Sequence, residues 1–354
     1  GNPSRLDDIP PESIERVEIL KGAAAATLYG TEASNGVIQI FTKRGRAGAP
    51  SFTVQGDWSA ISAPLNRIPP VSDYIGRDCS AIDCTGAGDA ATIAAIQDRM
   101  SQRFGITPQP VEAFQMDPSP FEEMLTTGFA QTYSASVNGG SDSFQYFVTG
   151  RYQYEDGVLD PQSVFPAVEG LEMETDTNRR AGFTANFTVI PNSQIRIGVS
   201  TLYSDMEQHT PDNGNNIFGV FSSLLMTQPR RATLQAEEGP GSNYFGAPTF
   251  GTTREFAYQQ NNAESSHFAG STTIGYTPTD NFRLDGTFGL DFTSDDRRFF
   301  RPFEWNVDGF SPFFTTGDRT VSEDRSREIT ADIKGSLITN LGDNIENTFL
   351  FGGQ

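Results

Sequence analysis

The sequence contains no run of apolar residues that approaches the roughly 20 needed for a membrane-spanning helix. It has 2 cysteines and 2 histidines in 354 residues, and so has few of the side chains that bind transition metals or form disulfides. Basic residues are also scarce, with 25 Lys and Arg against 45 Asp and Glu. Because nucleic-acid phosphates require clustered Lys and Arg, this charge balance argues against a nucleic acid as partner.

The sequence is rich in alternation of period two. In the segment 144–154, FQYFVTGRYQY, most aromatic and aliphatic residues fall on one side, whereas Gln145, Thr149 and Arg151 fall on the other. Successive side chains of a strand point to opposite faces, so such a segment has one apolar and one polar surface. Segments of about 10 residues or more are long enough for a tilted strand to cross a bilayer. The pattern favours a transmembrane antiparallel β-barrel, with a soluble β-sandwich as the alternative.

The pattern predicts nine strands, at 51–61, 130–138, 143–156, 177–190, 193–206, 263–277, 281–295, 324–339 and 346–353. Their polar faces would line the interior of the barrel, and include Arg151, Gln153, Asn186, Arg196, Arg283, Asp285, Asp291, Asp332 and Lys334. Bacterial single-chain barrels have an even number of strands. The chain also starts at Gly1 without Met or a signal peptide, so we expect it to be part of a larger barrel.

Short and long connections alternate along the chain. The short ones, such as GGSD at 139–142 and PTDN at 278–281, are built from residues that favour tight turns. In outer-membrane barrels the periplasmic turns are short and the extracellular loops are long. We therefore expect four extracellular loops, at 62–129, 157–176, 207–261 and 296–323.

The first part of the chain does not follow the barrel pattern. Residues 9–45 read IPPESIERVEILKGAAAATLYGTEASNGVIQIFTKRG, which predicts a strand at 14–20, a helical turn at 23–29 ended by Gly30, and a second strand at 36–42. The glycines between 30 and 36 lack the phosphate-loop pattern, and a nucleotide site is not expected.

These residues closely resemble the C-terminal part of the plug domain of TonB-dependent outer-membrane receptors, in the form found in the SusC/RagA branch. The residues that carry the resemblance are Leu20, Lys21, Gly22, Leu28, Tyr29, Gly30, Asn35, Gly36, Val37, Ile38, Lys43 and Gly45. The likeness continues through PFEEMLTTGFAQTYSASVNGGSDSFQYFVTGRYQYEDGVL, which is similar to the early barrel of that branch. We expect residues 1–46 to form part of an α+β plug and residues 47–354 the first strands of a barrel of about 22 strands.

The resemblance implies an active transporter of the bacterial outer membrane. Its partners would be the TonB–ExbB–ExbD complex, a SusD-like surface lipoprotein, membrane lipid and an oligosaccharide or peptide substrate. The alternatives are a siderophore or cobalamin receptor without a lipoprotein lid, a passive porin, and a soluble binding module. No cofactor is implied, and neither histidine has a recognisable catalytic partner in sequence, so the chain is not expected to be an enzyme.

The predicted loops hold the remaining candidate residues. Phe299, Phe300, Phe303 and Trp305 are candidate contacts to substrate or lid, although the same aromatics would serve equally as an interfacial girdle or as the core of the loop.

Two further loop features leave alternatives open. Cys79 and Cys84 are close enough in sequence for a disulfide, with metal binding the weaker alternative. The apolar stretch 217–226 predicts a short packing helix, and the polar run that starts at Asp212 predicts a plain turn rather than a calcium loop.

Overall fold

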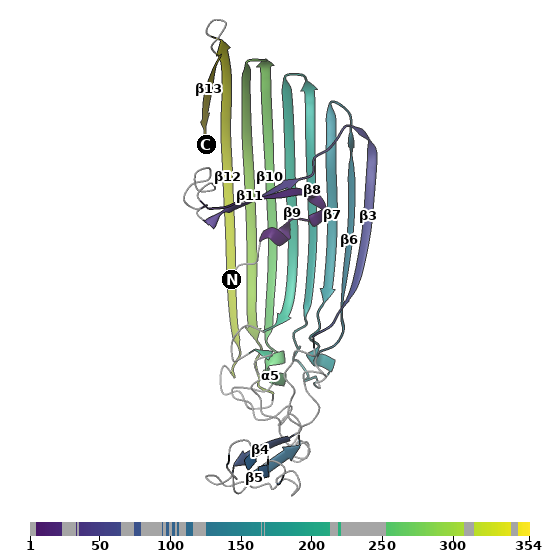
Figure 1. The fold of residues 1–354 in the computed structure, drawn as a ribbon. Coiled ribbons are helices and arrows are strands. Elements are labelled where there is room, and N and C mark those ends of the chain that lie inside the picture. Colours follow the sequence, from purple (N-terminus) through teal and green to yellow (C-terminus); the bar gives the residue numbers. More distant parts are fainter. Residues whose placement is uncertain are drawn as a thin grey trace.

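The computed structural model describes residues 5–22, 33, 35–64, 74–78, 94, 97–98, 101–102, 105, 111–115, 125–163, 165, 167–212, 219–220, 253–307, 315–340 and 346–354. Its main element is a curved antiparallel sheet of nine strands in the order β13-β12-β11-β10-β9-β8-β7-β6-β3 (Figure 1). The strands are β3 (Gly48–Ile61), β6 (Gly128–Gly140), β7 (Phe144–Asp156), β8 (Thr177–Asn192), β9 (Ile195–Pro211), β10 (Gln260–Thr279), β11 (Phe282–Arg301), β12 (Asp318–Asn340) and β13 (Glu346–Gly353). The nine predicted strands are confirmed, in the predicted order.

Several strands run further than the sequence pattern predicted. The connections expected at 207–261 and 296–323 are shorter in the structure, at 212–259 and 302–317, and the first begins at 62 and ends at 127. β10 and β11 have 20 residues each, which at about 3.3 Å per residue is about 66 Å, more than twice the height of an apolar band of about 25 Å. The extra residues of β9 and of the start of β10 are polar on both faces, and those of β11 are charged apart from Phe299 and Phe300, which fall on opposite faces. None of these stretches shows the apolar–polar alternation that marks a strand.

The two ends of the sheet differ, as the connection lengths predicted. At one end lie tight turns, such as Ser193–Gln194, where the Asn192 Oδ1 accepts hydrogen bonds from the backbone N–H of Gln194 and Ile195 at 2.9 and 3.0 Å. At the other end lie the connections that begin at residues 62, 157, 212 and 302 (Figure 1). We call these the turn end and the loop end.

The two faces of the sheet also differ. Directly paired residues of antiparallel strands point to the same face. Phe183, Tyr203, Phe268 and Phe292 are paired in one row across β8, β9, β10 and β11, and this face, called here the outer side, carries most of the exposed large apolar residues. The aromatic row and the apolar residues towards the turn end face no second sheet in the described part of the chain. This arrangement matches a barrel wall and argues against a sandwich.

The opposite face is polar and carries the described residues between 5 and 46, called here the plug segment after the resemblance of their sequence. β1 (Ile14–Leu20) pairs with β2 (Val37–Thr42), and this two-stranded sheet crosses the strands of the large sheet partway along their length (Figure 1). Two short 3₁₀ helices, η1 (Arg5–Asp8) and η2 (Pro11–Ser13), precede it. Gly36 enters β2 with φ +112°, and a Cβ there would lie 2.8 Å from the carbonyl oxygen of Leu20, so glycine is required.

A separate apolar core lies at the loop end. It is built from Leu159, Phe165, Met173, Val220, Phe256, Ala257, Tyr258 and Trp305. These residues come from the connections that follow β7, β9 and β11. Phe256 and Ala257 belong to the helix α5 (Thr253–Ala257), and the short helix η5 (Pro161–Ser163) lies in the connection after β7. The hairpin of β4 (Tyr74–Asp78) and β5 (Val111–Gln115) lies beyond this end (Figure 1). The described parts of the loops after β7, β9 and β11 therefore pack around one shared core.

In the part of the chain that is described, none of the helices has the length and apolar character needed to span a bilayer.

A charge on the outer side should be more costly than the same charge on the polar side. Ile274 of β10 is 49% exposed on the outer side, and Thr273 next to it faces the polar side. In the complete protein folded into lipid vesicles, Ile274→Arg should lower the free energy of unfolding by about 2–4 kcal/mol and Thr273→Arg by clearly less. Equal losses in denaturant titrations would contradict the assignment of the two faces.

Candidate functional site

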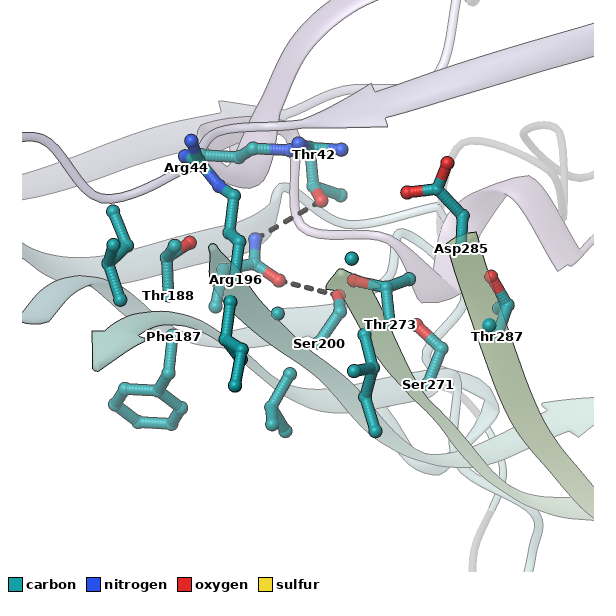
Figure 2. A pocket seen from close by; sticks show the side chains of 18 of the residues that line it. Thr42, Arg44, Phe187, Thr188, Arg196, Ser200, Ser271, Thr273, Asp285 and Thr287 are labelled. Atoms are coloured by element: carbon teal, nitrogen blue, oxygen red, sulfur yellow. Dashed lines mark hydrogen bonds between the residues drawn. The ribbon is translucent and has the colours of Figure 1, made fainter. Parts of the chain in front are cut away.

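The plug segment contacts the polar side of the large sheet through hydrogen bonds and ion pairs. Asn186 of β8 donates from Nδ2 to the carbonyl oxygen of Lys43 at 2.6 Å and to the Thr42 hydroxyl at 3.1 Å. Its Oδ1 accepts a hydrogen bond from Ser200 of β9 at 2.5 Å. Asn186 is therefore held by the neighbouring strand and in turn fixes the end of β2 (Figure 2).

The residues before β1 carry carboxylates that meet cationic side chains of the sheet. Glu12 pairs with Arg151 of β7 at 2.5 Å, with both side chains about one-fifth exposed. Arg180 of β8 donates to the carbonyl oxygen of Asp7 at 3.1 Å. Asp8 lies 2.8 Å from Nδ1 of His267 on β10. The segment is thus anchored on three different strands.

Apolar and backbone contacts complete the attachment. Pro10 packs on Gly182 of β8, where a Cβ would lie 3.1 Å from Pro10 Cγ. Gly45 passes so close to the backbone of Tyr146 in β7 that a Cβ there would overlap it. Next to it, the backbone N–H of Arg46 donates to Asn138 Oδ1 of β6 at 3.1 Å. The lack of a side chain at Gly45 lets the chain pass from the plug segment into β3.

Two polar cavities flank the plug segment. The one on the turn-end side has a volume of about 980 Å³, and Thr42 and Arg44 line it opposite Ser200, Thr273 and Asp285 of the sheet (Figure 2). The one on the loop-end side has a volume of about 370 Å³ and is lined by Asp7, Asp8, Ile9, Pro10, Pro11, Arg151, Gln153, Asn178, Arg180, Gly182 and Ser204. A polar solute that entered from the loop end would meet this second cavity first.

The four aromatic candidates of the last described loop have different environments. Trp305 is 1% exposed and lies in the loop core, 5.9 Å from the Phe256 ring centroid, which favours packing over ligand contact. Phe303 is 75% exposed. Between them Glu304 has φ 60°, a conformation unusual for a residue other than glycine. Phe299 and Phe300 are partly buried at the end of β11. Phe303 therefore remains the residue of this set that is free to meet a partner.

A buried carboxylate ties the second loop to the strand ends. Glu174 accepts hydrogen bonds from the backbone N–H of Thr175 at 3.0 Å and of Asn261 at 2.9 Å. Burial nevertheless raises its pKa, because desolvation outweighs these hydrogen bonds and the attraction of His209 and Arg298. Burial likewise raises the pKa of Asp176, which accepts from the backbone N–H of Leu159.

The sequence-predicted residues are only partly brought together. Leu20, Lys21, Gly22, Asn35, Gly36, Val37, Ile38, Lys43 and Gly45 lie in or next to the β1–β2 sheet. Leu28, Tyr29, Gly30, Cys79 and Cys84 lie outside the described residues, as does most of the apolar stretch 217–226.

Sequence reasoning gave no role to His267. Its two carboxylate partners, Asp8 and Asp291, stand 259 and 24 residues away in the chain. No local sequence motif indicates contacts over such separations. The contacts of His267 with the two carboxylates could therefore be found only from the structure.

Comparison with known proteins matches this architecture. The family model described as TonB-dependent Receptor Plug Domain matches residues 1–37. TonB-dependent receptor P26 of Formosa agariphila is 24% identical over 302 residues, which is 82% of this chain and 26% of that protein. TonB-dependent receptor SusC of Bacteroides thetaiotaomicron is 25% identical over 245 residues, which is 67% of this chain and 20% of that protein. The chain thus spans about a quarter of the length of the first of these relatives.

The fold has a close structural counterpart. A solved structure described as the RagAB peptide transporter superposes with a TM-score of 0.65 over 98% of this chain and 39% of the other, at 18% sequence identity. At this identity the superposition supports the fold alone.

We expect the stability of the second loop to depend on pH. A raised pKa means that the folded loop binds a proton more tightly than the unfolded one, so its stability is greatest below the ordinary carboxylate range and falls as pH rises through the raised values. Amide hydrogen exchange of residues 157–176, corrected for intrinsic rates, should show more frequent opening at pH 7 than at pH 5. Glu174→Gln with Asp176→Asn should flatten this dependence, and an unchanged slope would contradict it.

Loss of the Asn186 side chain should loosen the plug segment. Asn186→Ala removes the part-buried hydrogen bond to the carbonyl oxygen of Lys43, which is worth about 0.5–1.5 kcal/mol. In the complete protein, cysteine labelling at position 42 should become faster by about two- to tenfold. Thr188→Ala is the control, because Thr188 lies on the same side of β8 and its side chain makes no described hydrogen bond to the plug segment. Equal acceleration in both variants would show that the contact does not hold β2.

Proposed function

We propose that this chain, which belongs to the TonB-dependent outer-membrane receptors of the SusC/RagA type, is part of an energised importer that takes up an oligosaccharide or peptide together with a SusD-like surface lipoprotein. The observation that carries the proposal is the attachment of the plug segment to the polar side of the sheet. A plug that rests on hydrogen bonds and ion pairs is held in place yet separable, because water or solute can replace each contact.

The polar side of the sheet supports passage of a polar solute. The described cavities on both sides of the plug segment are lined mainly by hydroxyl, amide, carboxylate and guanidinium groups. Such groups bind sugar hydroxyls and peptide amides through many weak hydrogen bonds. Because each bond contributes little net free energy, the solute can dissociate from the surface. A displaced plug would leave this surface as the wall of a hydrated path.

The loop end supports docking of a lid. The described parts of the loops after β7, β9 and β11 share one apolar core, which supports a preformed surface at this end. Phe303 projects from this body, while Trp305 anchors the same turn inside it. An exposed aromatic on a rigid turn is the type of residue that dominates the binding energy of protein interfaces. We assign Phe303 to contact with the lipoprotein or the substrate.

Energy for plug displacement would come from the TonB–ExbB–ExbD complex. The match to the plug family, together with relatives named TonB-dependent receptors, supports this assignment. A passive porin would have no use for a plug segment anchored on several strands. A siderophore or cobalamin receptor shares the plug, and differs by needing no lipoprotein.

Uptake by the complete receptor in cells tests the proposal. Import of labelled oligosaccharides or peptides should stop when the proton gradient is collapsed, and should fall at least tenfold when the neighbouring lipoprotein is deleted. Uptake that survives loss of the gradient would identify a porin. Uptake of ferric siderophore or cobalamin that is independent of the lipoprotein would identify the alternative receptor class.

Phe303→Ala should weaken partner or substrate binding by about tenfold, as expected for an interface anchor. Phe349→Ala is the matched control, since Phe349 is 58% exposed but lies on the outer side of β13. The measurement is the binding constant of the complete receptor for the lipoprotein, and for the substrate, by calorimetry. An effect as large in the control would remove Phe303 from the proposed contact.

A further inference from the structure

His267 lies between two carboxylates that come from different parts of the chain. Its Nδ1 is 2.8 Å from Asp8 Oδ2 in the plug segment, and its Nε2 is 3.0 Å from Asp291 Oδ2 on β11. The imidazole is only 12% exposed. Ionised carboxylates only accept hydrogen bonds, and a neutral imidazole donates from one nitrogen alone. Both contacts are hydrogen bonds only when both ring nitrogens carry a proton, so the geometry is that of an imidazolium.

The surroundings of His267 favour a cation. Ser204 of β9 and Thr293 of β11 are its direct cross-strand neighbours and carry no charge. Within two residues of the cross-strand row of His267, the charged side chains on the same face of the sheet are Arg180 on β8, Asp291 and Asp295 on β11, and Asp324 and Glu328 on β12. Asp7 and Asp8 lie in the segment before β1, and Arg297 follows two residues beyond Asp295. Carboxylates dominate this set, and Arg180 is occupied by the Asp7 carbonyl oxygen and Met206.

We propose that His267 is a proton-dependent bridge between plug and barrel wall: the imidazolium fastens the segment Arg5–Ser13 through Asp8, and loss of its proton releases that attachment. Without the proton, one ring nitrogen presents a lone pair to a carboxylate, so one hydrogen bond is replaced by repulsion. The inference rests on the proposed function, in which the plug is the part that must move. It adds that ambient pH sets how firmly one edge of the plug is seated.

The other contacts of the segment do not titrate in the same range. A guanidinium group is not deprotonated in proteins, and the amide of Asn186 has no charge to lose. Histidine is the side chain whose ordinary titration falls between pH 5 and 8. The pH-dependent part of plug seating is therefore assigned to His267, while Arg151 and Asn186 supply the constant part.

Hydrogen exchange on the complete receptor in lipid nanodiscs tests the bridge. The population of open states of residues 5–13, corrected for intrinsic exchange, should rise by about tenfold or more between pH 5.5 and 8.5, as expected for loss of a hydrogen bond between charged groups. His267→Gln should have a high opening population at every pH, because glutamine does not titrate. Arg151→Gln is the matched control: it should raise opening at every pH and keep the slope.

Asp291→Asn provides a second variant that keeps the size of the side chain. It removes one of the two charges that hold the imidazolium, and the rise in opening should move to lower pH. A wild-type profile without slope, or a His267→Gln profile with the wild-type slope, overturns the proposal. The exchange is measured without substrate, lipoprotein or TonB, so this outcome is independent of whether uptake follows the proposed route.

Discussion

A bilayer offers no hydrogen-bond partners to the backbone, and this one constraint shapes the structure. Long antiparallel strands satisfy their backbone groups on neighbouring strands and leave the two faces to meet different surroundings. The aromatic row Phe183, Tyr203, Phe268 and Phe292 lies on one face, and Asn186 and His267 lie on the other. The plug segment rests on the polar face, where Asn186, Arg151 and His267 provide its hydrogen-bond and ion-pair partners.

The same separation explains why the plug is attached as it is. A tightly packed apolar interface would be costly to open, whereas hydrogen bonds and partly exposed ion pairs exchange with water at a small net cost. Glu12 with Arg151, and Asn186 with Lys43, fix position without a large apolar contact. At the loop end the contacts are apolar instead, because the core around Trp305 joins the described parts of the loops after β7, β9 and β11.

Much of this could be predicted from sequence, and the failures have physical causes. Period-two alternation located all nine strands, and the turn residues separated the two ends of the sheet. Strand ends beyond the apolar band were missed because they lack apolar–polar alternation, as in β11 from Asp296 to Arg301, where the adjacent Phe299 and Phe300 fall on opposite faces. The aromatics of the last described loop were left undecided, since sequence does not distinguish a buried Trp305 from an exposed Phe303.

The sequence by itself determined the strands, the identity of their two faces and the plug motif, because these depend on the order of residues over short stretches. The tertiary structure decided which residues meet across the interface. Asp8 and His267 are 259 residues apart, and only the curvature and register of the sheet bring them within hydrogen-bond distance. Local sequence patterns determine which side chains lie on each face of a strand. Contacts between distant segments depend on how the whole sheet is assembled.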